Sequence, residues 1–375
     1  MTMTKTAVIY DPLYLEHYTG VGHPESPQRL TAIMNGIKRI RLLETGNCVL
    51  LASKAISSEA LEAVHDPSYS KAIERISRSG GGAVDSDTIL SAKSYDAAIH
   101  AAGGMLDACE LVLAGKFSNA FALVRPPGHH AGTHGRALSA SSQGFCVFNN
   151  VAITAANLIE KHGLERVMIL DIDVHHGNGT QEIFNTTSKV LYISIHQDGR
   201  TLYPGTGFVD EIGEGEGEGS KVNIPLPPYS GDEIYLKVLK QIVIPIATEY
   251  RPEMMLISAG FDAHHTDPVA SMRLSSMGYL EMFEATLSLA SKLCSGKLAA
   301  VLEGGYNLDT LSKLVPGVIA KMAQVPFSIT DKRLSSSSDT TKLVGQVIKQ
   351  VKTTLAPYWS FNLRDIRNRC NNSTN

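Results

Sequence analysis

Short apolar runs that end in polar residues recur along the chain and predict buried β-strands. The first lies at residues 7–10. Later runs lead directly into segments that carry His, Asp, Glu or Tyr, and they lie at 121–124, 167–170, 190–195, 254–259 and 298–302. Because consecutive positions in these runs are apolar, the runs are typical of strands that are buried on both faces of a parallel sheet.

Longer segments with helical periodicity separate most of these runs. They lie at about 91–115, 149–162, 232–250 and 276–294. Strands that alternate with helices indicate βαβ units, a parallel sheet and right-handed crossovers. We therefore predict an α/β protein whose ligand binds beyond the carboxyl ends of the strands, where the polar residues gather.

The composition predicts one domain with an appendage. No compositional break divides residues 1–326, which we assign to a single catalytic domain. From residue 327 the chain becomes rich in Ser, Thr and Lys, and it then carries one more helical run at 342–354 and a polar tail. Residues 327–375 are expected to form a helical and polar appendage that packs on the domain or trails from it.

Charge and cysteine usage narrow the class of protein. The chain is 43% hydrophobic and 19% charged with a formal net charge of −3, which is typical of a soluble enzyme and argues against nucleic acid as a direct ligand. No apolar run is long enough to span a membrane, so no membrane partner is expected. Five cysteines without a CxxC pair suit a reducing compartment, and we expect a cytoplasmic protein. A homo-oligomer is one of the arrangements left open.

The polar residues after the run 167–170 include candidate metal ligands. We expect Asp171, Asp173 and His175 to lie on one face of an extended strand, because alternate side chains of a strand point the same way. Buried carboxylates need a compensating charge, and a divalent metal ion supplies one. Taken alone, the segment is equally compatible with a solvated strand end or an ion-pair network.

Asp173, His175 and Asp262 form the best candidate ligand set. Two carboxylates and one imidazole leave an open coordination position, which is typical of a catalytic metal site. Oxygen and nitrogen ligands permit Zn²⁺, Fe²⁺ or Mn²⁺, and the sequence does not choose among them. Taken alone, Asp262 is also compatible with a helix N-cap.

Two further segments carry candidate catalytic groups. His129 and His130 follow a Pro-Pro-Gly turn, and an imidazole whose pKa lies near neutrality can transfer protons beside a metal. Tyr306 follows Glu-Gly-Gly, and its phenol can donate a hydrogen bond to a developing oxyanion. Asp171 and Asn178 are candidate partners that would fix the tautomers of the two imidazoles.

An ordered set of motifs resembles the histone deacetylase family, in particular its class II and bacterial amidohydrolase branch. The motifs occur in family order and cover roughly residues 8–320. They are His23-Pro-Glu-Ser-Pro-Gln-Arg-Leu30, Arg125-Pro-Pro-Gly-His-His-Ala131, Gly144-Phe-Cys-Val-Phe-Asn-Asn150, Asp171-Ile-Asp-Val-His-His-Gly-Asn-Gly179, Tyr203-Pro-Gly-Thr-Gly207, Ser258-Ala-Gly-Phe-Asp262 and Glu303-Gly-Gly-Tyr306. The resemblance implies the single-domain arginase/deacetylase fold, with an eight-stranded parallel sheet between helices.

The resemblance also implies an activity and its cofactors. The chain would be a metal-dependent deacetylase that removes acetyl groups from an acetylated lysine side chain or a small acetylated amine. One zinc ion per chain would be held by Asp173, His175 and Asp262. A monovalent cation, potassium, would bind against the inner strand, where Asp171 and Ser194 match the family site.

Roles for the catalytic residues follow from the same resemblance. His130 would act as general base and then as general acid, oriented by Asn178. His129 would be an electrostatic partner paired with Asp171, and Tyr306 would polarise the acetyl carbonyl group.

The substrate tunnel can be assigned in the same way. Gly144, Phe145 and Tyr203 would wall its narrow part, and Arg29 would lie at the inner end, where acetate leaves. For Phe145 and Tyr203, filling of the core is the alternative to a substrate wall. The segment 132–143 is longer than in related chains and is expected to reshape the rim.

Three alternatives compete with this interpretation. An acetylpolyamine amidohydrolase would favour an acidic residue where this chain has the apolar Val269. A catalytically idle module that binds acetylated ligands would be expected to lose at least one of the catalytic groups. A two-metal ureohydrolase would need additional ligands, which His264 and His265 would supply.

Overall fold

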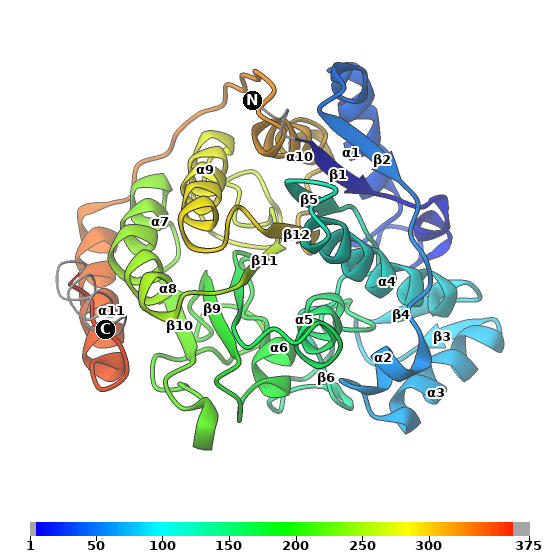
Figure 1. The fold of residues 1–375 in the computed structure, drawn as a ribbon, viewed down its shortest axis with the longest axis horizontal. Helices are drawn as coiled ribbons and strands as arrows, with labels where there is room; N and C mark the ends of the chain where they lie inside the picture. Colours follow the sequence, from blue (N-terminus) through cyan, green and yellow to red (C-terminus); the bar gives the residue numbers. More distant parts are fainter. Residues whose placement is uncertain (1–4, 363–375) are drawn as a thin grey trace.

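An eight-stranded parallel sheet forms the centre of the computed structural model, which describes residues 5–362 (Figure 1). The strand order is β10-β9-β8-β11-β12-β5-β1-β2, and all neighbouring pairs are parallel. The strands are β1 (Thr6–Ile9), β2 (Cys48–Leu51), β5 (Asn119–Ala122), β8 (Val167–Asp171), β9 (Val190–Gln197), β10 (Lys221–Leu226), β11 (Met254–Ala259) and β12 (Leu298–Leu302). The predicted α/β fold with an eight-stranded parallel sheet is confirmed.

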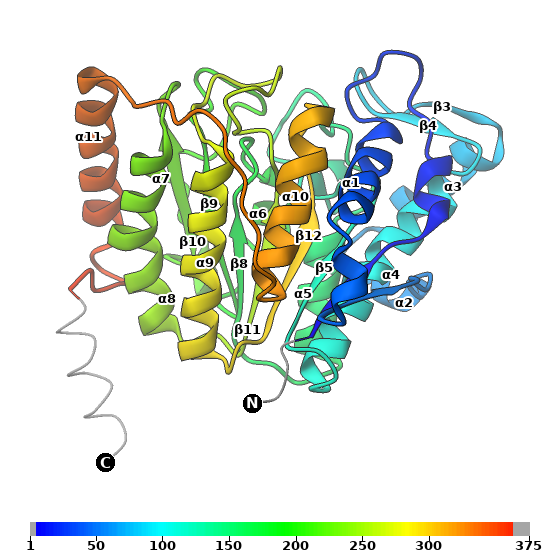
Figure 2. The same ribbon diagram turned by 90° about the horizontal axis from the view of Figure 1, so that it is seen from above.

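Helices cover both faces of this sheet (Figures 1 and 2). One layer holds α1 (Gln28–Arg39), α7 (Asp232–Val238), α8 (Ile244–Tyr250), α9 (Ser276–Leu293) and α10 (Leu308–Met322). The other face carries α4 (Ser94–Leu113), α5 (Asn150–Glu160) and α6 (Asn178–Ile183), with α2 (Ser58–Glu62) and α3 (Pro67–Arg78) beside them. Two small hairpins, β3 (Gly81–Ala83) with β4 (Ile89–Ser91) and β6 (Ala131–Gly132) with β7 (Gly135–Arg136), lie outside the main sheet.

The continuous apolar runs correctly mark the central strands. Every residue of β8, β9, β11 and β12 is buried, as expected for strands covered by helices on both faces. The pattern misses the outermost strands, β2 and β10. β2 lies at the sheet edge and is only partly buried, whereas β10 begins with a lysine and contains Asn and Pro.

Lys221 explains why β10 is hard to recognise from its sequence. Its side chain is fully buried, and its ammonium group donates hydrogen bonds to the carbonyl oxygens of Thr187 and Val190, both at 3.0 Å, and to the Ser220 hydroxyl at 2.7 Å. These oxygens replace part of the water that a lysine loses on burial, which makes a charged residue tolerable in a strand.

The long helical pattern at 232–250 is interrupted in the structure. α7 ends at Val238, and a π-helical turn over Leu239–Val243 precedes α8. Pro245 stands in the first turn of α8, and proline has no N–H group to donate to the preceding turn. The wider π turn lets the chain continue in the same direction past this residue.

The C-terminal helical run forms α11 (Ser338–Leu355), which lies beside β10 and α7 (Figure 2). Its apolar positions Val344, Ile348, Val351 and Leu355 are buried. The helix therefore packs on the domain, while the end of the predicted polar tail lies outside the described residues.

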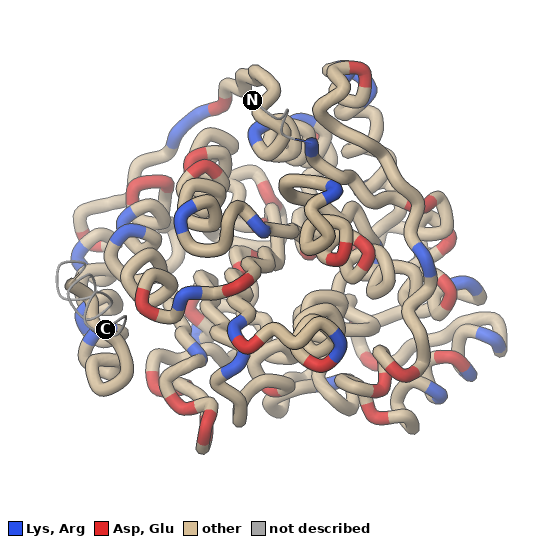
Figure 3. Tube along the Cα trace, in the orientation of Figure 1, with Lys and Arg blue, Asp and Glu red and all other residues tan. Residues whose placement is uncertain are grey.

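Among residues 5–362, the structure contains no helix with the length and apolar character needed to cross a lipid bilayer. On the face in view in Figure 3, Lys and Arg positions are interspersed with Asp and Glu positions. The described cysteines, Cys48, Cys109, Cys146 and Cys294, are buried and free of disulfides.

Candidate active site

Loops at the carboxyl ends of five strands, β5, β8, β9, β11 and β12, meet around one pocket of about 270 Å³. The segment after β5 contributes His129 and His130, and the segment after β8 contributes His175. Tyr306 follows β12 and lines the same pocket. Asp262, which follows β11, lies beside His175. The structure thus gathers residues that are far apart in the sequence at the edge of the sheet where α/β proteins bind ligands.

The first part of this site is a cluster of Asp173, His175 and Asp262 side chains. One nitrogen or oxygen atom from each lies within 4.8 Å of the others. Nδ1 of His175 is 3.0 Å from Oδ1 of Asp173 and 3.4 Å from Oδ2 of Asp262. This Oδ2 is buried and accepts no hydrogen bond from the described residues. An unsatisfied carboxylate oxygen beside a second carboxylate and an imidazole is the donor set that a divalent cation satisfies.

The charges of the Asp173, His175 and Asp262 side chains also favour a bound cation. Burial lowers the pKa of His175, but the hydrogen bond to Asp173 and the negative charges of Asp262 and Asp173 outweigh burial and raise the pKa to about 9. Burial and the charge of Asp173 raise the pKa of Asp262. The cluster therefore carries excess negative charge that favours a bound cation, whether a proton or a metal ion.

The ligand segment differs from the prediction in its backbone. β8 ends at Asp171, so the expectation that strand alternation aligns Asp171, Asp173 and His175 is wrong. The chain turns instead, because Oδ1 of Asp171 accepts from the N–H of Asp173 at 3.1 Å and Oδ1 of Asp173 accepts from the N–H of His175 at 2.9 Å. Two successive side-chain-to-backbone bonds place the ligands, as in Asx turns.

Glycines permit the two carboxylates to pack close to the backbone. A Cβ atom on Gly260 would lie 2.1 Å from Oδ2 of Asp173, and one on Gly304 would lie 2.0 Å from Oδ2 of Asp262. The N–H of Gly304 also donates to Oδ2 of Asp173 at 2.8 Å. Any side chain at these positions would displace the candidate ligands.

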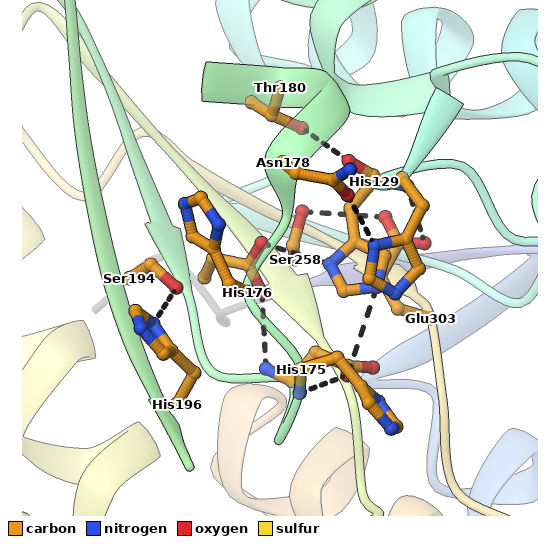
Figure 4. Close-up of polar contacts among 12 residues, drawn as sticks. His129, His175, His176, Asn178, Thr180, Ser194, His196, Ser258 and Glu303 are labelled. Carbon is orange, nitrogen blue, oxygen red and sulfur yellow. Dashed lines mark hydrogen bonds and ion pairs between the residues drawn. The ribbon is translucent and has the colours of Figure 1, made fainter. Parts of the chain in front are cut away.

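The two adjacent histidines have different partners, and Figure 4 shows His129 together with Asn178, the partner of His130. Nδ1 of His129 is 3.1 Å from Oδ2 of Asp171, which also accepts from the hydroxyl of Tyr192 at 3.0 Å. Burial lowers the pKa of His129, but the charges of Asp173 and Asp171 outweigh burial and raise it to about 10. The pKa of His130 is instead held well below its ordinary value by burial and by the charge of His129. His129 is therefore charged and His130 neutral at neutral pH.

Tyr306 borders the pocket from the other side. Its ring lies edge-on to Phe145, with centroids 5.8 Å apart, and the guanidinium carbon of Arg29 lies 5.0 Å from the ring centroid. Burial raises the pKa of Tyr306 well above its usual range, so the phenol keeps its proton. It is available as a hydrogen-bond donor.

Aromatic rings flank the approach to these groups. The ring of Tyr203 lies edge-on to His130, with centroids 4.9 Å apart, and its hydroxyl donates to Ser142 O at 2.7 Å. Gly144 has φ +53°, and a Cβ atom there would meet the His130 ring at 2.5 Å. Gly144, Phe145 and Tyr203 all line the pocket, as the predicted substrate wall requires.

Comparisons with known proteins agree with this arrangement. Residues 23–322 match the family described as "Histone deacetylase domain". A "Probable deacetylase" of Archaeoglobus fulgidus is 44% identical over 324 residues, which cover 86% of this chain and 88% of that protein. A "Histone deacetylase-like amidohydrolase" of Pseudomonas aeruginosa is 34% identical over 344 residues, covering 87% and 88% respectively.

The chain belongs to the histone deacetylase family. A solved structure titled "Crystal Structure of HDA15 HD domain" superimposes with a TM-score of 0.84 at 35% identity and covers 95% of both chains. The family resemblance proposed from the motifs is thereby confirmed. Membership makes the protein a hydrolase of the deacetylase type, in a family that generally depends on metal ions.

Arg29 lies behind the pocket of this deacetylase-family fold. Its side chain is fully buried and donates to Glu25 Oε1 at 3.1 Å, Glu303 O at 2.5 Å and Gly305 O at 2.6 Å. It therefore supports the loop that carries Tyr306. Arg29 is not among the residues that line the pocket, so its place at the inner end of the tunnel and its part in acetate release stay predictions.

Sequence reasoning missed several pocket residues. Ser86 and Asp87 line the rim, and they come from the loop between β3 and β4, which follows no strand of the main sheet. Oδ2 of Asp87 accepts from the hydroxyl of Ser142 at 2.5 Å and so anchors the 132–143 segment. Cys146, within the Gly144–Asn150 motif, also lines the pocket.

His264 and His265 do not join the Asp173–His175–Asp262 cluster. Nε2 of His264 is 2.8 Å from Oδ2 of Asp331, and its Nδ1 is 2.9 Å from the hydroxyl of Thr266. The contact with Asp331 ties the segment after α10 to the segment after β11. The geometry therefore gives no support to a two-metal ureohydrolase.

Proposed function

We propose that this protein is a zinc-dependent amidohydrolase that removes acetyl groups from acetyl-lysine or a related acetylated amine. The products would be acetate and a free amine. The observation that carries the proposal is the meeting of three metal-type ligands, the buried His130 and the phenol of Tyr306 around one pocket.

Asp173, His175 and Asp262 would hold one zinc ion per chain. The unsatisfied Oδ2 of Asp262 and the convergence of the three side chains support this assignment. When bound, the ion lowers the pKa of a water molecule and polarises the amide carbonyl group.

Proton transfer is assigned to His130. Its Nδ1 lies 2.7 Å from the side-chain oxygen of Asn178, so in the neutral ring Nδ1 carries the proton and Nε2 holds the lone pair. Nε2 would accept a proton from the attacking water and later donate it to the leaving amine. His129, held charged by Asp171, would stabilise negative charge nearby without exchanging a proton with the substrate.

Tyr306 would stabilise the transition state by donating a hydrogen bond to the carbonyl oxygen as that atom gains charge. Gly144, Phe145 and Tyr203 would enclose the alkyl chain of the substrate, since they give the pocket apolar and aromatic walls. Exclusion of water from this channel would strengthen each electrostatic contact at the reacting amide.

A potassium ion is proposed between the strands rather than in the pocket. Asp171 and Ser194 are direct neighbours in the register of β8 and β9, and both offer oxygen atoms. The Ser194 hydroxyl lies 2.7 Å from Nδ1 of His196, which fixes its position (Figure 4). Such a cation would stabilise the strand end that leads to the zinc ligands.

The proposal is tested by the hydrolysis of an acetyl-lysyl amide reporter before chelation, after chelation and after zinc is returned. We expect activity to be lost and then restored, with one zinc bound per active chain. Parallel assays with acetyl-spermidine distinguish a polyamine amidohydrolase, which would turn over that substrate faster. Absence of any amide hydrolysis by folded, zinc-loaded protein would refute the proposal and favour an idle ligand-binding module.

A further inference from the structure

The Gly305–Tyr306 peptide is held at both of its polar atoms. Its carbonyl oxygen, on Gly305, accepts from Nε of Arg29 at 2.6 Å. Its N–H group, on Tyr306, donates to Oδ2 of Asp267 at 2.7 Å. A cation thus binds the negative end of this peptide dipole, and a carboxyl group binds the positive end.

Asp267 makes further contacts that tie two pocket segments together. Oδ2 also accepts from the N–H of Asn307 at 3.2 Å, and Oδ1 accepts from the N–H of Val269 at 3.2 Å. Val269 and Tyr306 both line the pocket. One carboxyl group therefore joins the turn that carries Val269 to the loop that carries Tyr306.

The loop needs such support because of its glycines. Gly305 has φ +111°, a conformation open to glycine but rarely adopted by other residues. A glycine at this point allows many backbone conformations, so the direction of the next side chain is set by whatever fixes the peptide. The side chain of Asp267 is only 7% exposed, and buried hydrogen bonds hold a peptide more firmly than solvated ones.

We propose that Asp267 is a positioning residue that holds Tyr306 in its reactive orientation by binding the N–H groups of Tyr306 and Asn307. This inference rests on the proposed role of Tyr306 in amide hydrolysis. Asp267 does not contact the substrate in this scheme. It acts through the backbone, opposite Arg29, and its loss would let the Gly305–Tyr306 peptide rotate.

The test compares Asp267→Asn with Asp309→Asn. Asparagine keeps the size of the aspartate side chain but loses its negative charge and one acceptor oxygen, so it cannot accept from Val269 and from the Tyr306 and Asn307 N–H groups together, and its hold on the Tyr306 peptide is weaker. Asp309 lies in α10, is exposed and pairs with Lys313. Its substitution therefore makes the same change in charge but leaves the hydrogen bonds of Asp267 to the backbone intact.

The first readout does not depend on activity. Hydrogen exchange of a peptide that contains Tyr306 and Asn307 should be on the order of tenfold faster in Asp267→Asn and unchanged in Asp309→Asn. Peptides from the rest of α10 should exchange as in the unsubstituted protein. Unchanged exchange at Tyr306 would overturn the proposal even if the enzyme proves to be an active deacetylase.

The second readout is kinetic. Asp267→Asn should lower kcat on the order of tenfold with little change in KM or in bound zinc, since the loss lies in transition-state geometry. In a Tyr306→Phe background the same substitution should change kcat by less than about twofold, because the two residues act as one unit. Full additivity of the two losses would refute an action through Tyr306.

A second variant covers the case in which Asp267→Asn does not fold. Asp267→Ser removes the carboxyl group and leaves a hydroxyl too short to reach both N–H groups. It should show the same faster exchange and the same loss of kcat, and wild-type values for both would contradict the proposal. If the unsubstituted zinc-loaded protein hydrolyses no acetyl amide, the proposed function is wrong. The exchange experiment still decides whether Asp267 holds the N–H groups of Tyr306 and Asn307.

Discussion

Nδ1 of His130 lies 2.7 Å from the side-chain oxygen of Asn178. The amide nitrogen of Asn178 donates to Ala137 O at 2.8 Å, which turns its oxygen toward the imidazole. The partner of His130 is therefore neutral, whereas the partner of His129 is the carboxylate of Asp171. The two adjacent rings thus differ in charge state, because the carboxylates beside His129 outweigh its burial and raise its pKa, whereas burial and the charge of His129 lower the pKa of His130.

This relationship gives a first prediction. Asn178→Ala should lower kcat on the order of 10- to 100-fold, because His130 loses the acceptor that fixes its tautomer and orientation. KM and zinc content should change little, since Asn178 contacts neither the substrate wall nor the ligand set. The measurement is steady-state hydrolysis of an acetyl-lysyl reporter together with metal analysis. Asn35→Ala, on the exposed face of α1, is the control. Wild-type kcat in Asn178→Ala would exclude the tautomer argument.

Tyr306→Phe provides a second prediction. Phenylalanine keeps the ring contacts with Phe145 and Arg29 but removes the hydroxyl group. We expect kcat to fall on the order of 10²- to 10³-fold with a much smaller change in KM, as when one oxyanion donor is removed. Tyr229→Phe, at an exposed tyrosine, should leave both constants unchanged. A variant with unaltered kcat would show that another group stabilises the oxyanion.

The central sheet could be predicted from the sequence because burial on both faces leaves a direct signal. The strands that hold Val167–Asp171 and Met254–Ala259 are apolar at successive positions, and helices separate them. The edge strands gave no such signal. Lys221 is buried through contacts with carbonyl oxygens that only the folded chain provides. The resemblance supplied the strand count that periodicity alone did not.

Site residues that directly follow a central strand could be predicted from the sequence. Residues whose position depends on a turn, or that come from a distant loop, could not. Asp173 and His175 were recognised as ligand types, but their placement depends on turns that strand geometry does not describe. Asp87 reaches the rim from a hairpin outside the main sheet. Asp267 acts through backbone N–H groups 39 and 40 residues away, a relationship that no local pattern encodes.

A third prediction concerns the dependence of stability on pH. Nδ1 of His65 donates to Gly132 O at 2.9 Å, and Nε2 accepts from the N–H of Asn149 at 2.9 Å, so the contact with Asn149 requires a neutral ring. Burial lowers the pKa of His65 to about 4. The unfolded chain binds this proton below its ordinary pKa of about 6.5, whereas the native state resists it until about 4. Stability should therefore fall as pH decreases through this window, by up to about 3 kcal/mol from His65.

Urea unfolding at several pH values between 7 and 4 tests this linkage. His65→Gln should be less stable than the unsubstituted protein at pH 7, yet its free energy of unfolding should fall less on acidification. His162→Gln, at an exposed histidine that pairs with Glu110, should keep the original slope. Equal slopes in all three proteins would show that His65 does not contribute to the acid sensitivity.

The last prediction tests the contact between α1 and α10 with two glycine substitutions of opposite expected sign. A Cβ atom on Gly36 would lie 2.0 Å from Ser312 O and 2.7 Å from Cγ of Pro316, so the helices would have to separate. Overpacking of this kind costs about 1–3 kcal/mol and exceeds the gain of about 1 kcal/mol that alanine offers within a helix. Gly345 in α11 is exposed, and its added Cβ would meet nothing within 4 Å.

Gly36→Ala should therefore lower the free energy of unfolding, while Gly345→Ala should raise it by about 0.5–1 kcal/mol. Urea denaturation of both variants measures the two changes against the same unfolded chain. Because the amino-acid exchange is identical, helix propensity cancels in the comparison and the difference reports the close approach of α1 to Ser312. If Gly36→Ala were more stable than the unsubstituted protein, α1 could move away from α10 without a loss in the free energy of unfolding. Arg29 of α1, which donates to Gly305 O, would then not hold the Tyr306 loop in one fixed position.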